Sequence, residues 1–110
     1  MWTQFLGNDM QAITSENFNQ EVIQSSIPVL CDFWAEWCPP CRAMMPHLTD
    51  LSNSANGKYK VVKIDIDKCP DLADKYQVSA IPTVIIFKNG EVANRMVGLQ
   101  TKQNLESALS

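Results

Sequence analysis

The feature that most constrains this 110-residue chain is a pair of cysteines, Cys38 and Cys41, that follows a nearly unbroken apolar run. The run covers residues 28–35 and has the character of a strand buried on both faces of a sheet. The two residues between the cysteines are both proline, and proline suits the first turn of a helix, where no backbone N–H is needed. The sequence therefore predicts a strand, a tight turn and a helix that begins at two thiols.

This placement predicts redox chemistry. A cysteine at the start of a helix faces unpaired backbone N–H groups and the positive end of the helix dipole, and both favour the thiolate. We therefore expect Cys38 to have a lowered pKa and to be the nucleophile. Cys41 follows one helical turn later on the same face, close enough to bond the sulfur of Cys38. The fixed φ angles of Pro39 and Pro40 stiffen this loop, which suits reversible thiol–disulfide exchange.

Two charged residues interrupt otherwise apolar strands. Asp32 lies inside the buried run, where desolvation should raise the pKa of its carboxyl group. Such a group can hold or take a proton near neutral pH, so we predict a catalytic role for Asp32. Lys63 lies in a second predicted strand, and pairing with Asp32 would compensate both charges. The alternatives are a structural carboxylate satisfied by hydrogen bonds and a lysine that reaches from its strand to water.

Hydrophobic periodicity predicts alternating strands and helices. Residues 5–13 are ambiguous and could include a short edge strand. The predicted strands cover residues 28–35, 59–67, 83–87 and 92–97. The predicted helices cover residues 15–24, 39–54 and 70–76 and a last segment that Thr101 caps.

This order predicts an α/β fold with one mixed sheet of about five strands flanked by about four helices, in a single domain over residues 1–110. Active groups in such sheets lie beyond the C-terminal ends of parallel strands, and the cysteine pair falls at that place. A 45% hydrophobic composition is enough for one core without disulfide bonds as staples.

Charge and hydropathy exclude several classes of function. The net charge of −3, without a block of like charges, argues against non-specific binding to nucleic acid or to an anionic membrane. No apolar run approaches the roughly 20 residues that a membrane helix needs. The first twelve residues contain no Lys or Arg and no apolar core, so they do not read as a signal peptide. Four cysteines are too few for a secreted disulfide scaffold, and we expect a cytoplasmic protein.

A zinc site is the alternative for the cysteine pair, and we predict no metal. Zinc needs four ligands, whereas Cys31, Cys69 and the single histidine, His47, are scattered along the chain. We interpret Cys31 as a small core residue and His47 as a solvated one. Cys69 is interpreted as an incidental surface or half-buried cysteine, with an exposed regulatory thiol as the alternative.

Several separate motifs resemble the thioredoxin family. In chain order they are Asp32-Phe33-Trp34-Ala35-Glu36-Trp37-Cys38, a proline before Cys41, Pro46, Ile81-Pro82-Thr83, Phe87-Lys88-Asn89-Gly90 and Val97-Gly98. The resemblance covers nearly the whole chain from the first predicted helix to the last. Pro39 is a departure, because thioredoxins carry glycine there. A Cys-Pro-Pro-Cys loop is also similar to tryparedoxin and to nucleoredoxin-type members of the superfamily.

The resemblance implies a thioredoxin fold and a thiol–disulfide oxidoreductase that reduces protein disulfides. It implies that Cys38 attacks a substrate disulfide and that Cys41 resolves the mixed disulfide. It implies that Asp32 assists proton transfer for the resolving thiol and that Lys63 lies near this acid. No cofactor is implied, because the Cys38–Cys41 disulfide is itself the redox centre.

The resemblance also implies how partners bind. The Ile81–Pro82 bond would be cis, and the backbone of Ile81 would bind an extended substrate chain. The implied contact surface around the sulfurs consists of Trp37, Pro39, Pro40, Ile81, Pro82, Val97 and Gly98. The implied partners are protein disulfides and a flavin, NADPH-dependent thioredoxin reductase, with the protein acting as a monomer. A thiol oxidase or disulfide isomerase, a tryparedoxin-like electron carrier and a redox-independent interaction subunit remain as alternatives.

Overall fold

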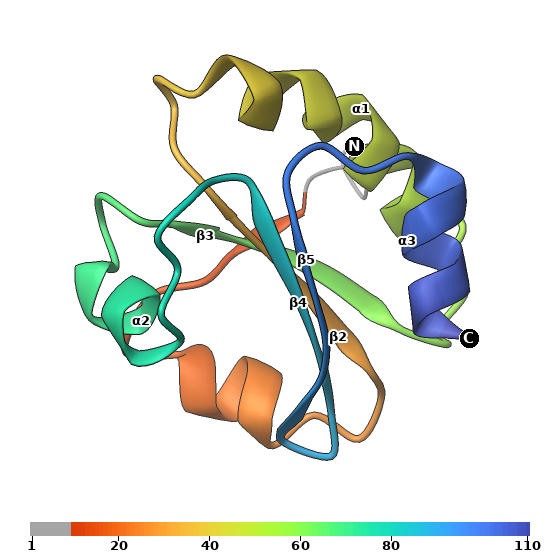
Figure 1. The fold of residues 1–110 in the computed structure, drawn as a ribbon. Coiled ribbons are helices and arrows are strands. Elements are labelled where there is room, and N and C mark those ends of the chain that lie inside the picture. The colour runs from red at the N-terminus through yellow and green to blue at the C-terminus, as the bar shows by residue number, and fades with distance from the viewer. Residues whose placement is uncertain (1–9) are drawn as a thin grey trace, which may run out of the picture.

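The order of strands and helices along the chain is the predicted one. The structure is a computed structural model that describes residues 10–110 (Figure 1). Its strands are β1 (Gln11–Ala12), β2 (Val29–Trp34), β3 (Lys60–Asp65), β4 (Thr83–Lys88) and β5 (Glu91–Val97). Its helices are η1 (Asn19–Ile23), α1 (Pro39–Asn53), α2 (Pro70–Lys75) and α3 (Lys102–Leu109).

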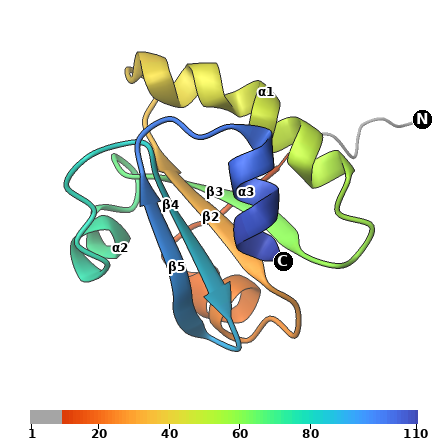
Figure 2. The same cartoon turned by 45° about the vertical axis from the view of Figure 1, so that its right-hand side comes forward.

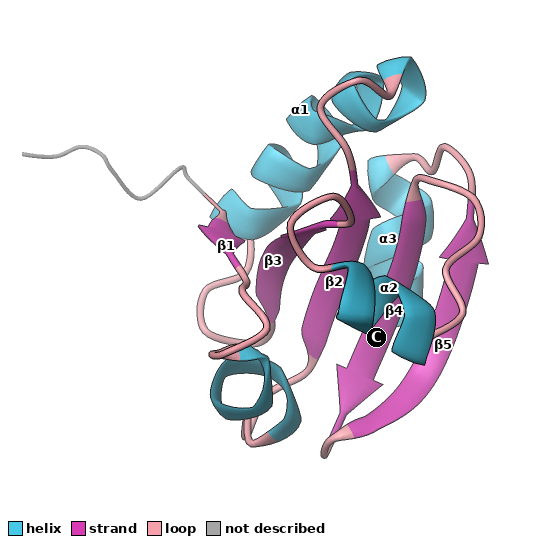
Figure 3. Ribbon diagram, turned by 90° about the vertical axis from the view of Figure 1, so that its left-hand side faces the viewer, coloured by secondary structure: helices cyan, strands magenta, loops and turns pink. Residues whose placement is uncertain are grey.

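The five strands form a single mixed sheet in the order β1-β3-β2-β4-β5 (Figure 3). β1, β3 and β2 run parallel, whereas β4 is antiparallel to β2 and β5 is antiparallel to β4. Helices α1 and α3 cover one face, and η1 and α2 lie on the other (Figures 1 and 2). The predicted mixed sheet between two layers of helices is therefore confirmed.

The central strands are buried because helices cover both of their faces. In β2, Leu30 packs with Met44 and Leu48 of α1 on one face. Cys31 and Phe33 of the same strand point to the other face, where they pack with residues of η1 and α2. Side chains alternate between the two faces along β2, so Asp32 lies on the α1 face with Leu30. It is two residues nearer than Leu30 to the start of that helix.

The hairpin between β4 and β5 turns at Asn89 and Gly90, as the sequence predicts. Both residues have a positive φ, 54° for Asn89 and 79° for Gly90, which is the geometry of the turns that suit hairpins. A side-chain carbon at Gly90 would lie 3.0 Å from the carbonyl oxygen of Ile23 in η1. This glycine therefore serves both the turn and the close approach of the first helix.

The first helix is shorter than predicted. The hydroxyl of Thr14 accepts the N–H of Asn17, and the amide oxygen of Asn17 accepts the N–H of Thr14. These reciprocal bonds cap the helical turn that begins after Thr14, where the backbone N–H of Phe18 bonds the carbonyl of Thr14. The assigned helix covers only Asn19–Ile23, and the backbone N–H of Gln24 bonds the carbonyl of Asn19 in a wide π turn.

The ambiguous stretch at residues 5–13 contains one short strand, β1, which adds to the outer edge of β3. The part of that stretch before residue 10 lies outside the described residues, as does most of the segment considered for a signal peptide. In residues 10–110, no helix is both long enough and apolar enough to cross a membrane.

Candidate active site

The two redox cysteines lie where the chain leaves β2 and enters α1. Cys38 is the N-cap residue of α1, in an extended conformation, and Pro39 and Pro40 form the first positions of the helix. Cys38 and Cys41 are joined by a disulfide with a Cα–Cα distance of 5.3 Å. The Sγ atom of Cys38 accepts the backbone N–H of Cys41 at 3.3 Å. The sulfur therefore occupies the place of a capping acceptor, where negative charge is stabilised.

The two sulfurs differ in their access to solvent. Cys38 is 3% exposed and Cys41 is 0% exposed. Both belong to a small cluster with Ala35, against which Trp34 and Ile81 pack. Because Cys41 is covered, a disulfide of another protein can reach Cys38 only. The two sulfurs are therefore unequally accessible, and their separate roles stay a prediction.

The predicted contact surface gathers around Cys38. The Sγ atom of Cys38 lies 3.8 Å from the carbonyl oxygen of Ile81, and the Ile81–Pro82 peptide bond is cis. The backbone N–H of Gly98 donates to the carbonyl of Pro82, which joins the end of β5 to this loop. Val97 is 58% exposed.

The helix side of this surface is formed by exposed residues of the redox loop. Trp37 is 63% exposed, and its indole N–H donates to the carboxylate of Asp67 at 2.8 Å. Pro39 and Pro40 are exposed beside it. The structure thus brings together all seven residues that were predicted to form the contact surface.

Two residues of this surface were not predicted from the sequence. Asp67 holds the ring of Trp37, and the signal for it is that an indole N–H usually finds an acceptor. Leu99 is 57% exposed and follows Gly98 directly. The signal for Leu99 is a large apolar side chain in a loop that follows a strand.

Asp32 and Lys63 are partners in the register of β2 and β3, so they lie on adjacent strands. No ion pair within 4 Å joins them in residues 10–110, so the predicted pairing of the two charges is not formed there. Asp32 is buried, and neither of its carboxylate oxygens has a hydrogen-bond partner within residues 10–110. Burial raises the pKa of Asp32 to about 7, and the positive charge of Lys63 partly opposes this rise. No protein group within residues 10–110 satisfies this carboxylate, and the catalytic role of Asp32 stays a prediction.

The remaining cysteines and the histidine lie apart from this site. Cys31 is fully buried in the core, and burial raises the pKa of its thiol. Cys69, interpreted from the sequence as a surface or half-buried cysteine, is buried, because the segment after β1 covers it and its thiol donates to the carbonyl of Ile13. His47 is exposed. Within residues 10–110, no three His, Cys, Asp or Glu side chains are grouped as metal ligands.

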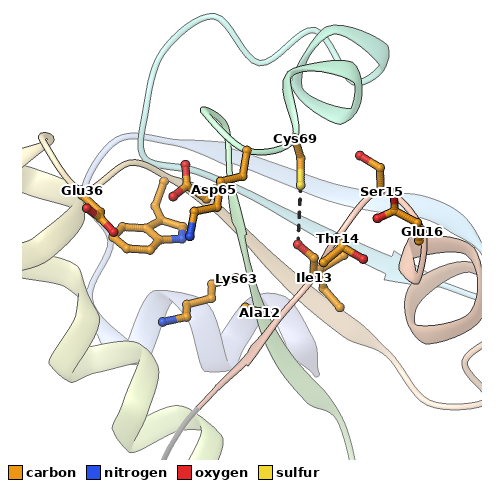
Figure 4. Close-up of a pocket in the computed structure, with 11 residues that line it drawn as sticks. Ala12, Ile13, Thr14, Ser15, Glu16, Glu36, Lys63, Asp65 and Cys69 are labelled. Atoms are coloured by element: carbon orange, nitrogen blue, oxygen red, sulfur yellow. Dashed lines mark hydrogen bonds between the residues drawn. The ribbon is translucent and has the colours of Figure 1, made fainter.

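A pocket of about 420 Å³ lies beside the site, and the sequence did not predict it. Its walls come from the segment after β1, the ends of β2 and β3, and the loop before α2 (Figure 4). Glu36, Lys63, Asp65 and Cys69 line it, together with Trp34. The pocket gives the side chain of Lys63 a route to solvent.

A mixed sheet with a disulfide at the N-terminus of the helix after its central strand defines a thiol–disulfide oxidoreductase. Comparisons with known proteins agree. The Thioredoxin family model matches residues 9–110. The thioredoxin of Rickettsia bellii (strain RML369-C) is 46% identical over 84% of this chain and 89% of its own length. Thioredoxin C-2 of Corynebacterium nephridii is 47% identical over 84% of this chain and 85% of its own. Thioredoxin 1 of Nostoc sp. is 42% identical over 88% of this chain and 91% of its own.

The chain therefore belongs to the thioredoxin family. It is a protein-disulfide oxidoreductase, and its Cys38–Cys41 disulfide fits dithiol–disulfide exchange. Membership of this family implies protein disulfides as substrates and interaction with a reductase. The fold and the activity expected from the sequence are thus confirmed.

Proposed function

We propose that this protein acts in the reducing direction, with Cys38 as the nucleophile and Cys41 as the resolving thiol. The observation that carries the proposal is the N-cap position of Cys38, whose sulfur accepts a helix N–H while keeping some exposed surface. A sulfur held in this way is stabilised as a thiolate and is the one that a partner can reach.

The reaction begins with the reduced protein. The Cys38 thiolate attacks one sulfur of the substrate disulfide, the substrate S–S bond breaks, and the other substrate sulfur leaves as a thiolate that takes a proton from water. The product is a mixed disulfide between Cys38 and the substrate. No group other than the two sulfurs carries the electrons.

Asp32 and Lys63 act in the second step. Cys41 gives its proton to the Asp32 carboxylate, and its sulfur attacks Cys38 as the second substrate thiolate leaves. Two electrons have then passed to the substrate, and the Cys38–Cys41 disulfide has formed. A pKa of about 7 suits Asp32 for this task, because both of its protonation states are present at neutral pH. Lys63 keeps that pKa from rising further.

The substrate chain docks on the apolar surface around Cys38. An extended segment lies against the backbone of Ile81, and side chains that flank the substrate cysteine contact Trp37, Pro39, Pro40, Pro82, Val97 and Gly98. The exposure of Trp37 and Val97 supports this assignment, because large exposed apolar side chains beside a reactive group are typical of a docking surface.

The finer identity of the partners follows the family resemblance. The reductase that regenerates the dithiol is a flavin enzyme that draws on NADPH, and the protein works as a monomer in the cytoplasm. The sparse cysteine content supports a reducing compartment.

Turnover of insulin disulfides, followed as precipitation of the freed chains, tests the proposed function. Cys38→Ser should abolish turnover, whereas Cys41→Ser should stop after one step and accumulate a mixed disulfide. Cys69→Ser is the matched control, because this buried thiol lies outside the mechanism and its loss should leave turnover intact. Turnover by Cys38→Ser, or a reduction potential above that of the glutathione pool, would refute the reducing role.

A further inference from the structure

Trp34, the last residue of β2, lies on the same face of the sheet as Asp32, two positions earlier. It packs against the cluster that contains Cys38 and Cys41. Its indole nitrogen is buried and has no hydrogen-bond partner within residues 10–110. The ring is therefore held by packing, and no acceptor among the described residues explains its orientation.

The ring of Trp34 carries a cation on its face. The ammonium nitrogen of Lys63 lies 5.2 Å from the centroid of the ring, which is a cation–π distance. Lys63 is also the register partner of Asp32 on β3, yet no ion pair within 4 Å joins them in the described part of the chain. The ammonium thus acts on the carboxylate from a distance and is in contact with the ring.

Without the ring, the ammonium group of Lys63 could move into the neighbouring pocket. Its side chain lines the pocket of about 420 Å³ and extends along the wall away from Thr14 and Cys69 (Figure 4). A lysine on a partly buried strand position moves its charged end to water when it can. Loss of the ring would free the ammonium to move into this pocket, away from Asp32.

Few charged groups face Asp32. Lys63 faces it from β3, and the register partner on β4 is Val84, which carries no charge. Helix α1 contributes Cys38 and Cys41, which do not titrate while they form the disulfide. Cys31, next to Asp32 in sequence, points to the other face of the sheet. In the oxidised protein, burial is the largest influence on the pKa of this carboxyl group, and the charge of Lys63 is the one that opposes it among the described residues.

We propose that Trp34 is a positioning residue for the proton-transfer step, whose ring holds the Lys63 ammonium beside Asp32 and thereby sets the proton affinity of that carboxyl group. This role rests on the proposed function of Asp32. Its consequence is that a protein without the ring has less Asp32 carboxylate available at neutral pH to take the proton of Cys41.

Titration of the Asp32 carboxyl carbon by NMR in the oxidised protein tests the proposal. Trp34→Leu should move the midpoint to higher pH by about half a unit, because the ammonium is released. Lys63→Met should move it up at least as far. The double variant should match Lys63→Met alone, since the ring acts through the ammonium. Trp34→Phe, which keeps an aromatic face, should return most of the way to the original midpoint.

Lys75→Met is the matched control. Lys75 lies 5.6 Å from the ring centroid of Tyr76 at α2, on the opposite side of the sheet, and its loss should leave the Asp32 midpoint unchanged. The proposal would be overturned if Trp34→Leu lowered the Asp32 midpoint, or if it raised the midpoint equally in the wild-type and Lys63→Met backgrounds. It would also be overturned if Trp34→Phe shifted the midpoint as far as Trp34→Leu does. If Trp34→Leu does not fold, Trp34→Met replaces it, because methionine adapts to irregular space.

A separate measurement distinguishes this inference from the proposed function. Resolution of the mixed disulfide in Asp32→Asn should be slow if Asp32 accepts the proton of Cys41. Normal resolution there would remove the catalytic role of Asp32. The titration would still decide whether Trp34 sets the pKa of Asp32 through Lys63.

Discussion

Replacement of Asp32 by alanine should stabilise the folded protein, and by an amount that grows with pH. The carboxyl group is buried among apolar neighbours, and its oxygens have no hydrogen-bond partner in residues 10–110. Ionising it in the folded state is therefore costly, whereas the unfolded chain ionises it freely in water. The wild-type protein bears this cost at every pH at which the unfolded carboxyl is charged.

The magnitude follows from the pKa. Burial raises the pKa of Asp32 from 3.8 to about 7, so between these values the unfolded state binds fewer protons than the folded state. Stability then falls as pH rises through this range, and the loss is complete above about pH 7. At 1.36 kcal/mol for each pKa unit, the loss is about 4 kcal/mol. This is a large share of the roughly 5–15 kcal/mol that stabilises a typical domain.

Urea unfolding of the oxidised wild-type and Asp32→Ala proteins, from about pH 4 to about pH 9, measures this effect as a difference curve. The alanine variant should gain up to about 4 kcal/mol over the wild type at the alkaline end, relative to the acidic end. Asp32→Asn is the matched control, because it also removes the titration. Its difference in unfolding free energy from the wild type should change with pH as it does for Asp32→Ala. The two curves should be separated by a constant amount, since the buried amide still needs hydrogen bonds. A difference that does not change with pH would refute the reasoning.

Three further predictions concern the redox loop and the glycines. In the reduced protein near neutral pH, iodoacetamide should label Cys38 well before Cys41, because only Cys38 combines an N-cap position with exposed surface; mass spectrometry would contradict this if both react equally. Trp37→Ser should lower kcat/KM for protein disulfides several-fold more than for a small aromatic disulfide, because the exposed ring contacts only a large partner; equal losses in the two assays would argue against docking at this ring. Gly90→Ala should lower the free energy of unfolding more than Gly57→Ala, which should cost about 1–2 kcal/mol for its positive φ. Both glycines have φ near +80°, but only at Gly90 would an added carbon meet a backbone oxygen, at 3.0 Å. Equal denaturation midpoints for the two variants would contradict this prediction.

The predictable part of this protein is the part that local pattern determines. The cysteine pair, the prolines between them and the buried run before them fix a strand, a turn and a helix, because each residue type favours the same local structure as its neighbours. Asp32 was recognisable because a charge in a buried strand is rare. The hairpin was recognisable because Asn89 and Gly90 tolerate the positive φ that its turn requires.

What the sequence could not supply depends on contacts between distant segments. Cys69 is buried because the segment after β1 packs over it, and its partner Ile13 lies 56 residues earlier. The bond between Trp37 and Asp67 likewise joins two loops, 30 residues apart. The position of the Lys63 ammonium depends on a ring on the neighbouring strand. None of these contacts has a periodicity or a spacing that a sequence pattern reveals.

In the proposed mechanism, the placement of the Lys63 ammonium reconciles two demands on Asp32. A close ion pair would stabilise the carboxylate and return its pKa toward that of an ordinary aspartate, and the group would then seldom hold a proton at neutral pH. Complete loss of the cation would leave only desolvation, and the pKa would rise until little carboxylate was available to accept one. An ammonium held on the ring of Trp34, in register with Asp32 but not in contact with it, leaves the pKa at about 7. The stability lost through the buried charge and the capacity to move a proton thus arise from the same placement.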